Sequence, residues 1–140
     1  MADIVQDTTI AVAPERVYGA ITRQQELARW WTRDVKAEPT VGSVAEFRFD
    51  KGETVFEMEI VALDAAKKVE WRVHSGPPHW QGTTVTWALA PAAGGTALHF
   101  AHTGFAAANR LYEETRGGWE YFLGSLKAYL ETGTGTPHGE

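Results

Sequence analysis

The sequence contains no cysteine, so it has neither a disulfide framework nor a thiolate that could act as a nucleophile or metal ligand. It has no apolar run long enough to span a bilayer, and residues 1–9 lack the charged and apolar regions of a signal peptide. Lysine and arginine are scattered and the net charge is -5, which argues against nucleic-acid binding and membrane adsorption. We therefore expect a cytoplasmic protein that does not insert into membranes.

The 140 residues have the length of one ordinary domain, and six tryptophans are many for that length. The clearest pattern is an amphipathic helix over residues 111–132, ended by Gly133. Its apolar stripe consists of Tyr112, Trp119, Phe122, Leu123, Leu126 and Leu130. Such a stripe needs a broad apolar partner. We expect a single domain over residues 1–132 and a disordered tail over 133–140.

Gly117 and Gly118 interrupt this helical pattern, each at a cost of about 1 kcal/mol relative to alanine. The first interpretation is a break, with one helix ending before Thr115 and a second beginning at Gly118. The alternative is that a missing side chain leaves room for a neighbouring backbone or a ligand. Only Gly118 lies beside the apolar stripe, so only Gly118 is a candidate for clearing interior space.

Alternation of apolar and polar residues predicts six strands, each with one buried and one solvated face. The first covers residues 3–12, and the others cover residues 43–50, 54–63, 68–74, 83–91 and 96–102. Turns fit between them, at Lys51-Gly52 among other places. Glu57 and Glu59 fall on the outer face, where we expect ion pairs with Arg48 and Arg72.

Two short helices are expected between the first and second of these strands. Pro14 suits the first position of a helix, with Glu15 near its positive end. Thr22 and Gln25 have the spacing of a capping box, which predicts a second helix leading to Trp30 and Trp31.

The order of elements and several short motifs resemble the START-like (SRPBCC, helix-grip) superfamily. Within it, they resemble the Aha1-like branch, named for the activator of Hsp90 ATPase. The matching pieces are residues 13–18, 27–31 and 42–49, Gly95-Thr96, residues 98–102, Gly104-Phe105, Gly118-Trp119, Leu123 and Leu126. The resemblance implies an α+β helix-grip fold, here a curved, six-stranded antiparallel sheet around the C-terminal helix, often with an apolar cavity. Relatives include lipid and hormone carriers, polyketide cyclases and subunits of ring-hydroxylating oxygenases, so no catalytic residue carries over.

We predict a binding module for a small hydrophobic molecule, aromatic or lipid-like, in a cavity between sheet and helix. The expected ligand-binding residues share inward positions on strands or lie on or beside the helix stripe: Trp31, Phe49, Phe56, Met58, Trp71, Trp87, His102, Tyr112, Gly118, Trp119 and Phe122. A solid core of large residues is the alternative for this set. No cofactor is expected, and the pattern leaves the oligomeric state open.

Two other functions remain open at this stage. One is an enzyme of cyclase or hydrolase type that uses His102 and a tyrosine in the same cavity. The other is a module that binds a protein partner such as a chaperone, which exposed apolar residues over 30–39 would favour. No nucleophile with its base and orienting group is recognisable, so we predict no catalytic residue.

The histidines do not predict a metal site. His99 and His102 are three residues apart on a strand and therefore point to opposite faces. His74 and His79 flank a turn where a third ligand is lacking. On the inner face, His102 suits a general base or a hydrogen-bond donor to a ligand. The alternative is a half-buried histidine bonded to a backbone carbonyl.

Overall fold

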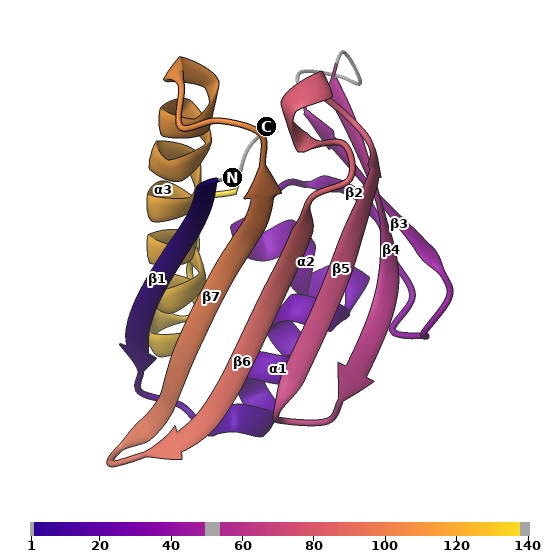
Figure 1. Cartoon of the computed structure of the whole chain (residues 1–140). Helices are drawn as coiled ribbons and strands as arrows, with labels where there is room; N and C mark the ends of the chain where they lie inside the picture. The colour runs from indigo at the N-terminus through magenta and orange to yellow at the C-terminus, as the bar shows by residue number, and fades with distance from the viewer. Residues whose placement is uncertain (1, 50–53, 138–140) are drawn as a thin grey trace.

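The computed structural model describes residues 2–49 and 54–137 of the chain, and the turn predicted at Lys51-Gly52 lies outside them. Its strands form one curved antiparallel sheet in the order β1-β7-β6-β5-β4-β3-β2, with the helices on its concave side (Figure 1). The strands are β1 (Ala2–Ile10), β2 (Asp34–Lys36), β3 (Val44–Phe49), β4 (Thr54–Asp64), β5 (Lys68–Ser75), β6 (Thr84–Ala92) and β7 (Gly95–Phe105). The helices are α1 (Pro14–Thr22), α2 (Gln24–Trp30), α3 (Arg110–Thr132) and the short 3₁₀ helix η1 (Pro78–Trp80).

The sequence predicted this α+β helix-grip architecture, but with six strands where the described residues form seven. The missed strand is β2, which pairs with β3 through the register Val35 to Phe47. Three residues with one buried side chain, Val35, are too short to produce a recognisable alternation.

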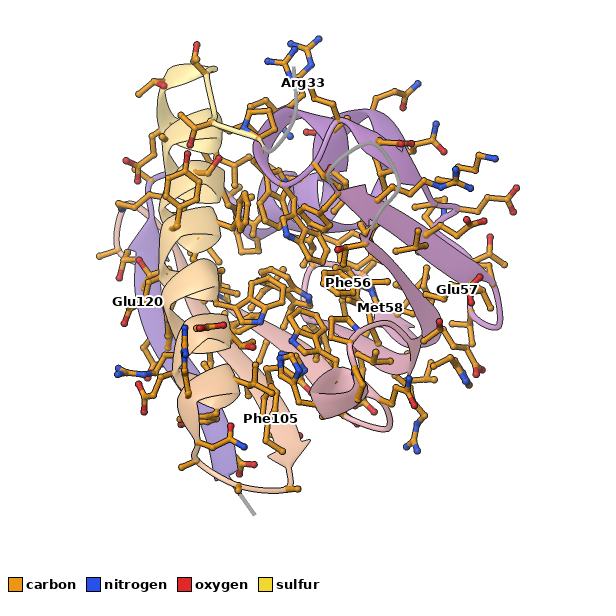
Figure 2. The ribbon with its side chains drawn as sticks, turned by 90° about the horizontal axis from the view of Figure 1, so that it is seen from above. Arg33, Phe56, Glu57, Met58, Phe105 and Glu120 are labelled. Carbon is orange, nitrogen blue, oxygen red and sulfur yellow. The ribbon has the colours of Figure 1, made fainter. Side chains whose placement is uncertain are left out.

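The predicted inner and outer faces of the strands are confirmed. Met58 is completely buried, whereas Glu57 on the same strand lies on the opposite, outer face (Figure 2). The expected ion pairs on that outer face differ in their partners. Glu59 lies opposite Arg72 in the register but pairs with His74 at 2.7 Å. The other predicted partner, Arg48, pairs instead with Glu46 on its own strand at 3.0 Å.

The first short helix begins at Pro14 as predicted, but the capping box expected for the second is wrong. Thr22 belongs to the last turn of α1, where its hydroxyl donates a hydrogen bond to the Tyr18 carbonyl at 2.8 Å. Its side chain is therefore engaged within α1, and Arg23 occupies the N-cap of α2 without a side-chain cap.

Helix α3 continues without a break through Gly117 and Gly118, so the predicted interruption is wrong. The side chain of Asn109 caps its start by accepting a hydrogen bond from the Tyr112 amide. Gly133 ends it in the left-handed conformation, with φ of 90°. The cost of two glycines is offset because the flanking Trp119 is buried against the sheet, and tertiary packing outweighs local propensity.

Side chains of α3 bind backbone groups of β1, the strand at one edge of the sheet (Figure 1). The Tyr112 hydroxyl donates to the Asp3 carbonyl at 2.7 Å, and the Lys127 ammonium donates to the Thr9 carbonyl. Glu131 accepts a hydrogen bond from the Ala11 amide, just after β1, at 2.9 Å. These contacts fix the helix along the strand over most of its length.

We expected residues 133–140 to form a disordered tail, but the described part, residues 133–137, returns to the domain instead. The Thr136 amide donates to the Ser125 hydroxyl at 2.7 Å, and that hydroxyl donates to the Trp30 carbonyl at 2.7 Å. A Cβ atom at Gly135 would lie 2.6 Å from the Arg29 carbonyl oxygen, so this close approach requires glycine.

Candidate functional site

A cavity of about 310 Å³ lies between α3, η1 and the adjoining ends of β3 and β4. Aromatic side chains predominate in its wall, whose residues are Trp31, Phe49, Thr54, Phe56, Pro77, His79, Trp80, Glu114, Thr115, Gly118, Trp119 and Phe122. Figure 2 shows side chains filling most of the space between α3 and the sheet, with Phe56 in this interior and Glu120 on the far side of the helix. The cavity occupies the part of the interior that these rings leave unfilled.

Six of the eleven residues predicted to bind a ligand border this cavity: Trp31, Phe49, Phe56, Gly118, Trp119 and Phe122. Among them, Gly118 contributes empty space, because a Cβ atom built on it would meet no atom within 4 Å. A Cβ atom on Gly117 would also meet no atom within 4 Å, but Gly117 does not line the cavity, and this difference agrees with the choice of Gly118.

The other five predicted residues do not border the cavity. Met58, Trp71 and Trp87 share the inward side of their strands with the lining residues but are almost completely buried in the packed core. Tyr112 lies beyond the cavity near the start of α3, where its hydroxyl is engaged by the β1 backbone. His102 is also sealed within the core, with 0% of its surface exposed.

His102 has both ring nitrogens in hydrogen bonds, which leaves neither free for the general-base role considered for it. The indole Nε1 of Trp119 donates to its Nδ1 at 3.0 Å. Its Nε2 lies 2.8 Å from the Thr83 hydroxyl, which itself donates to the Trp80 carbonyl. Because the Thr83 hydrogen is committed there, Nε2 of His102 carries the ring proton. Burial, with a smaller contribution from His79, lowers the pKa of His102 from 6.5 to about 3.

The alternative expectation, a half-buried histidine bonded to a backbone carbonyl, is also wrong in detail. His102 is fully buried and uses two side chains as its partners, which lie on α3 and just before β6. His102 therefore links the sheet to α3. Its two hydrogen bonds engage both ring nitrogens and favour the neutral imidazole.

The wall of the cavity is held by ring-to-ring packing. Trp80 stacks on Phe56 with centroids 4.4 Å apart and an interplanar angle of 6°. Trp31 packs against Trp119 at 5.1 Å and stacks on Trp71 at 6.0 Å. Because the lining rings are themselves supported by core rings, the aromatic surface toward the cavity is preorganised.

A single hydroxyl, that of Thr115, joins η1 to α3 across the cavity. It donates to the Leu111 carbonyl at 2.9 Å and accepts a hydrogen bond from the Trp80 indole at 3.1 Å. Nε2 of His79 lies 3.2 Å from the same oxygen. Since the Thr115 hydrogen is already committed, His79 donates from Nε2, and its Nδ1 is a hydrogen-bond acceptor.

The charges around the cavity are few and of one sign. Glu114 is the one Asp or Glu among the lining residues, and neither lysine nor arginine is among them. Burial lowers the pKa of His79 below its ordinary value, although the Glu114 carboxylate acts in the opposite direction. His79 is accordingly neutral at physiological pH.

The candidate site residues that were not predicted are mostly polar. Thr115 lies four residues before Trp119 on the same helical stripe, a spacing that places both on one face, but we selected only large apolar side chains there. His79 and Trp80 belong to η1; the segment of Trp80 was considered as a rim of the interior, but neither residue was among those predicted to bind a ligand. No short-range pattern predicts that η1 folds over toward α3.

Among residues 2–49 and 54–137, no group of three or more His, Cys, Asp or Glu side chains is arranged to hold a metal ion. No helix in the same ranges is long and apolar enough to cross a membrane.

A curved antiparallel sheet that grips one long helix, with an apolar cavity between them, defines the START-like, helix-grip class of domains. The chain matches the family described as "Activator of Hsp90 ATPase homolog 1-like protein" over residues 11–131, and it belongs to that family. No curated protein matches the chain significantly.

Solved structures agree with this assignment. The Aha1 dimer from Colwellia psychrerythraea is similar at 31% identity with a TM-score of 0.88, over 96% of this chain and 100% of that one. A protein from Mesorhizobium loti is similar at 26% identity with a TM-score of 0.81, over 92% of this chain and 96% of that one. DynU16, from the dynemicin biosynthetic locus, shares the fold at 23% identity with a TM-score of 0.78, over 95% of this chain and 48% of that one.

Proposed function

We propose that the protein binds a small aromatic molecule in the cavity between η1 and α3. The observation that carries this proposal is the combination of unfilled space and a preorganised aromatic wall. A volume of about 310 Å³ is at the lower end of the range that accommodates small organic ligands, which favours a compact ring system over a long lipid chain.

The geometry gives less support to an enzyme. His102, which the enzyme hypothesis would use as a base, is neutral, sealed and fully hydrogen-bonded, and it does not border the cavity. Among the other titratable groups in the wall, His79 contacts the Thr115 hydroxyl but donates to it, because that hydroxyl already donates to the Leu111 carbonyl, so His79 does not activate it as a nucleophile.

Binding of a chaperone, which the family description suggests, receives no support from the segment expected to provide it. Exposed apolar residues over 30–39 would have favoured this function, but Trp30, Trp31 and Val35 are buried. The large apolar side chains that are exposed in the described ranges are spread over several elements: Val5, Val41, Val44, Leu111 and Tyr121. We therefore place the cavity ahead of the surface as the functional site.

The proposal is tested by titrating the protein with a panel of flat aromatic compounds while tryptophan emission is recorded. Trp31, Trp80 and Trp119 border the cavity, so a bound ring system should quench or shift the emission saturably. Calorimetry on the same compounds provides an independent measure of affinity. An absence of saturable binding across the panel would overturn the proposal.

A matched pair of variants locates the binding site. Gly118→Leu places a large side chain in the cavity, whereas Gly117→Leu places the same side chain on the exposed face of the same helix. Both replace a helical glycine, so their effects on helix propensity are equal. We expect Gly118→Leu to abolish binding and Gly117→Leu to leave it unchanged. Equal effects of the two variants would place the ligand elsewhere.

A further inference from the structure

The polar groups of the cavity carry information about the ligand beyond its aromatic body. The Thr115 hydroxyl makes three hydrogen bonds, one as donor to Leu111 and two as acceptor from Trp80 and His79. A hydroxyl has one hydrogen and two lone pairs, so this group has no remaining capacity for a ligand.

The same arrangement assigns the tautomer of His79. Its Nε2 carries the proton that is donated to Thr115, which leaves Nδ1 with a lone pair. No hydrogen bond joins this nitrogen to another group in the described part of the chain. His79 borders the cavity and is half-buried, and Nδ1 is its one ring nitrogen that Thr115 leaves free.

The carboxylate of Glu114 is a second acceptor in the wall, and the hydroxyl of Thr54 is a further, uncharged polar group there. Arg110 pairs with Glu114 at 3.0 Å, but Arg110 is almost fully exposed and does not line the cavity. Because the wall has no lysine or arginine, it provides no counter-charge for a carboxylate or phosphate, and Glu114 repels such a group. A buried anion without a counter-charge is strongly disfavoured.

We infer that the ligand is an aromatic molecule without negative charge that donates a hydrogen bond, from a hydroxyl or amine, to Nδ1 of His79. This inference rests on the proposed function. The aromatic wall provides affinity for the ring system. His79 then selects which end of the molecule enters the cavity and distinguishes donor-bearing ligands from those that only accept hydrogen bonds.

Three probes with the same bicyclic body test this inference by calorimetry at neutral pH: 2-naphthol, 2-methoxynaphthalene and 2-naphthoate. The first donates a hydrogen bond, the second has lost the donor, and the third is an anion. We expect 2-methoxynaphthalene to bind about three- to tenfold more weakly than 2-naphthol, which corresponds to one lost hydrogen bond. The anion should bind more weakly by about tenfold or more.

The variant His79→Phe keeps an aromatic ring but removes the acceptor nitrogen. We expect its affinity for 2-naphthol to fall to that for 2-methoxynaphthalene, whose own affinity should not change and so reports that the site remains folded. The control is His74→Phe, because His74 is exposed, pairs with Glu59 and does not border the cavity. It should retain the preference for 2-naphthol.

In the wild-type protein, the ¹⁵N resonances of the His79 ring give a second readout. Before ligand is added, Nδ1 should have a pyridine-like shift and Nε2 a pyrrole-like shift, and 2-naphthol should move the Nδ1 resonance. If 2-methoxynaphthalene or 2-naphthoate binds as tightly as 2-naphthol, or if His79→Phe retains the preference, the inference is wrong while the proposed binding function stands. If none of the probes binds, both are overturned.

Discussion

The indole of Trp119 donates a hydrogen bond to Nδ1 of His102 at 3.0 Å, inside a core where neither side chain is more than 2% exposed. This bond links α3 to β7 directly. It also determines the charge of the imidazole, since protonation at Nδ1 would set two N–H groups against each other. Nδ1, the ring nitrogen of His102 that could accept a proton, thus already accepts the hydrogen bond from Trp119 of α3.

The first prediction is that acid destabilises the protein through His102. The unfolded chain binds a proton there near pH 6.5, whereas the folded chain binds it only near pH 3. The contribution of this group to stability is therefore fully present above pH 6.5 and is lost as the pH falls toward 3. Between pH 6 and pH 4 the loss should be about 2–3 kcal/mol, measured by urea denaturation.

The variant His102→Gln should be less stable at neutral pH but should lack this part of the pH dependence. The exposed His99, which pairs with Asp7 on the outer face, is the control, and His99→Gln should retain the slope. If His102→Gln has the same slope as the wild type, the assignment to His102 is incorrect.

The second prediction concerns the contact between α3 and the core. Leu126 is completely buried, so Leu126→Ala should lower the free energy of unfolding by about 2–5 kcal/mol through lost burial and an added cavity. Leu111→Ala, at a position 45% exposed on the same helix, should change it by less than about 0.5 kcal/mol. Similar costs in chemical denaturation would contradict the face assigned to α3.

The third prediction separates a cavity from a solid core by stability alone. A Cβ atom at Gly118 would meet nothing within 4 Å, so Gly118→Leu should be no less stable than the wild type. In a filled interior the same change would overpack the site and cost about 1–3 kcal/mol. Thermal melts of Gly118→Leu and Gly117→Leu should therefore agree, and a marked loss confined to the former would show that the space is filled.

The fourth prediction is that the residues after α3 are held to the domain by Gly135. In Gly135→Ala, the new methyl group would collide with the Arg29 carbonyl and should displace the segment. The Thr136 amide, which donates to Ser125, should then exchange with solvent much faster in hydrogen-exchange measurements. Gly124→Ala, where a Cβ meets no neighbour, is the control and should leave Thr136 protected.

The fold could be predicted largely from the sequence because its main elements have strong periodic patterns. Alternation placed residues such as Phe47 and Trp71 on the inner face, and the 3.6-residue period placed Leu123 and Leu126 there. The prediction failed where local signals conflict with tertiary packing. Gly117-Gly118 indicates a break, and only the burial of neighbouring side chains against the sheet keeps that part of α3 helical.

The candidate site was less predictable, because it depends on which inward residues meet empty space. Met58 and Phe56 have the same parity on β4, yet only Phe56 borders the cavity. Phe56 stacks on Trp80 of η1, whereas Met58 is completely buried, and the position of η1 is not encoded in the pattern of β4. The hydrogen bond between Thr115 and His79 joins residues 36 positions apart and has no signature in the sequence.

The contacts between α3 and β1 also bear on how copies of this protein meet one another. An exposed edge strand offers unpaired backbone groups to a strand of another molecule, which is a common route to aggregation. Here two such groups, the carbonyls of Asp3 and Thr9, and the amide of Ala11 just after the strand are already bound by side chains of the protein's own helix. The opposite edge is the short strand β2, only three residues long. Pairing with a strand of another molecule is therefore obstructed near both ends of β1, and β2 offers only three residues, so extension of the sheet between folded molecules is disfavoured at either edge.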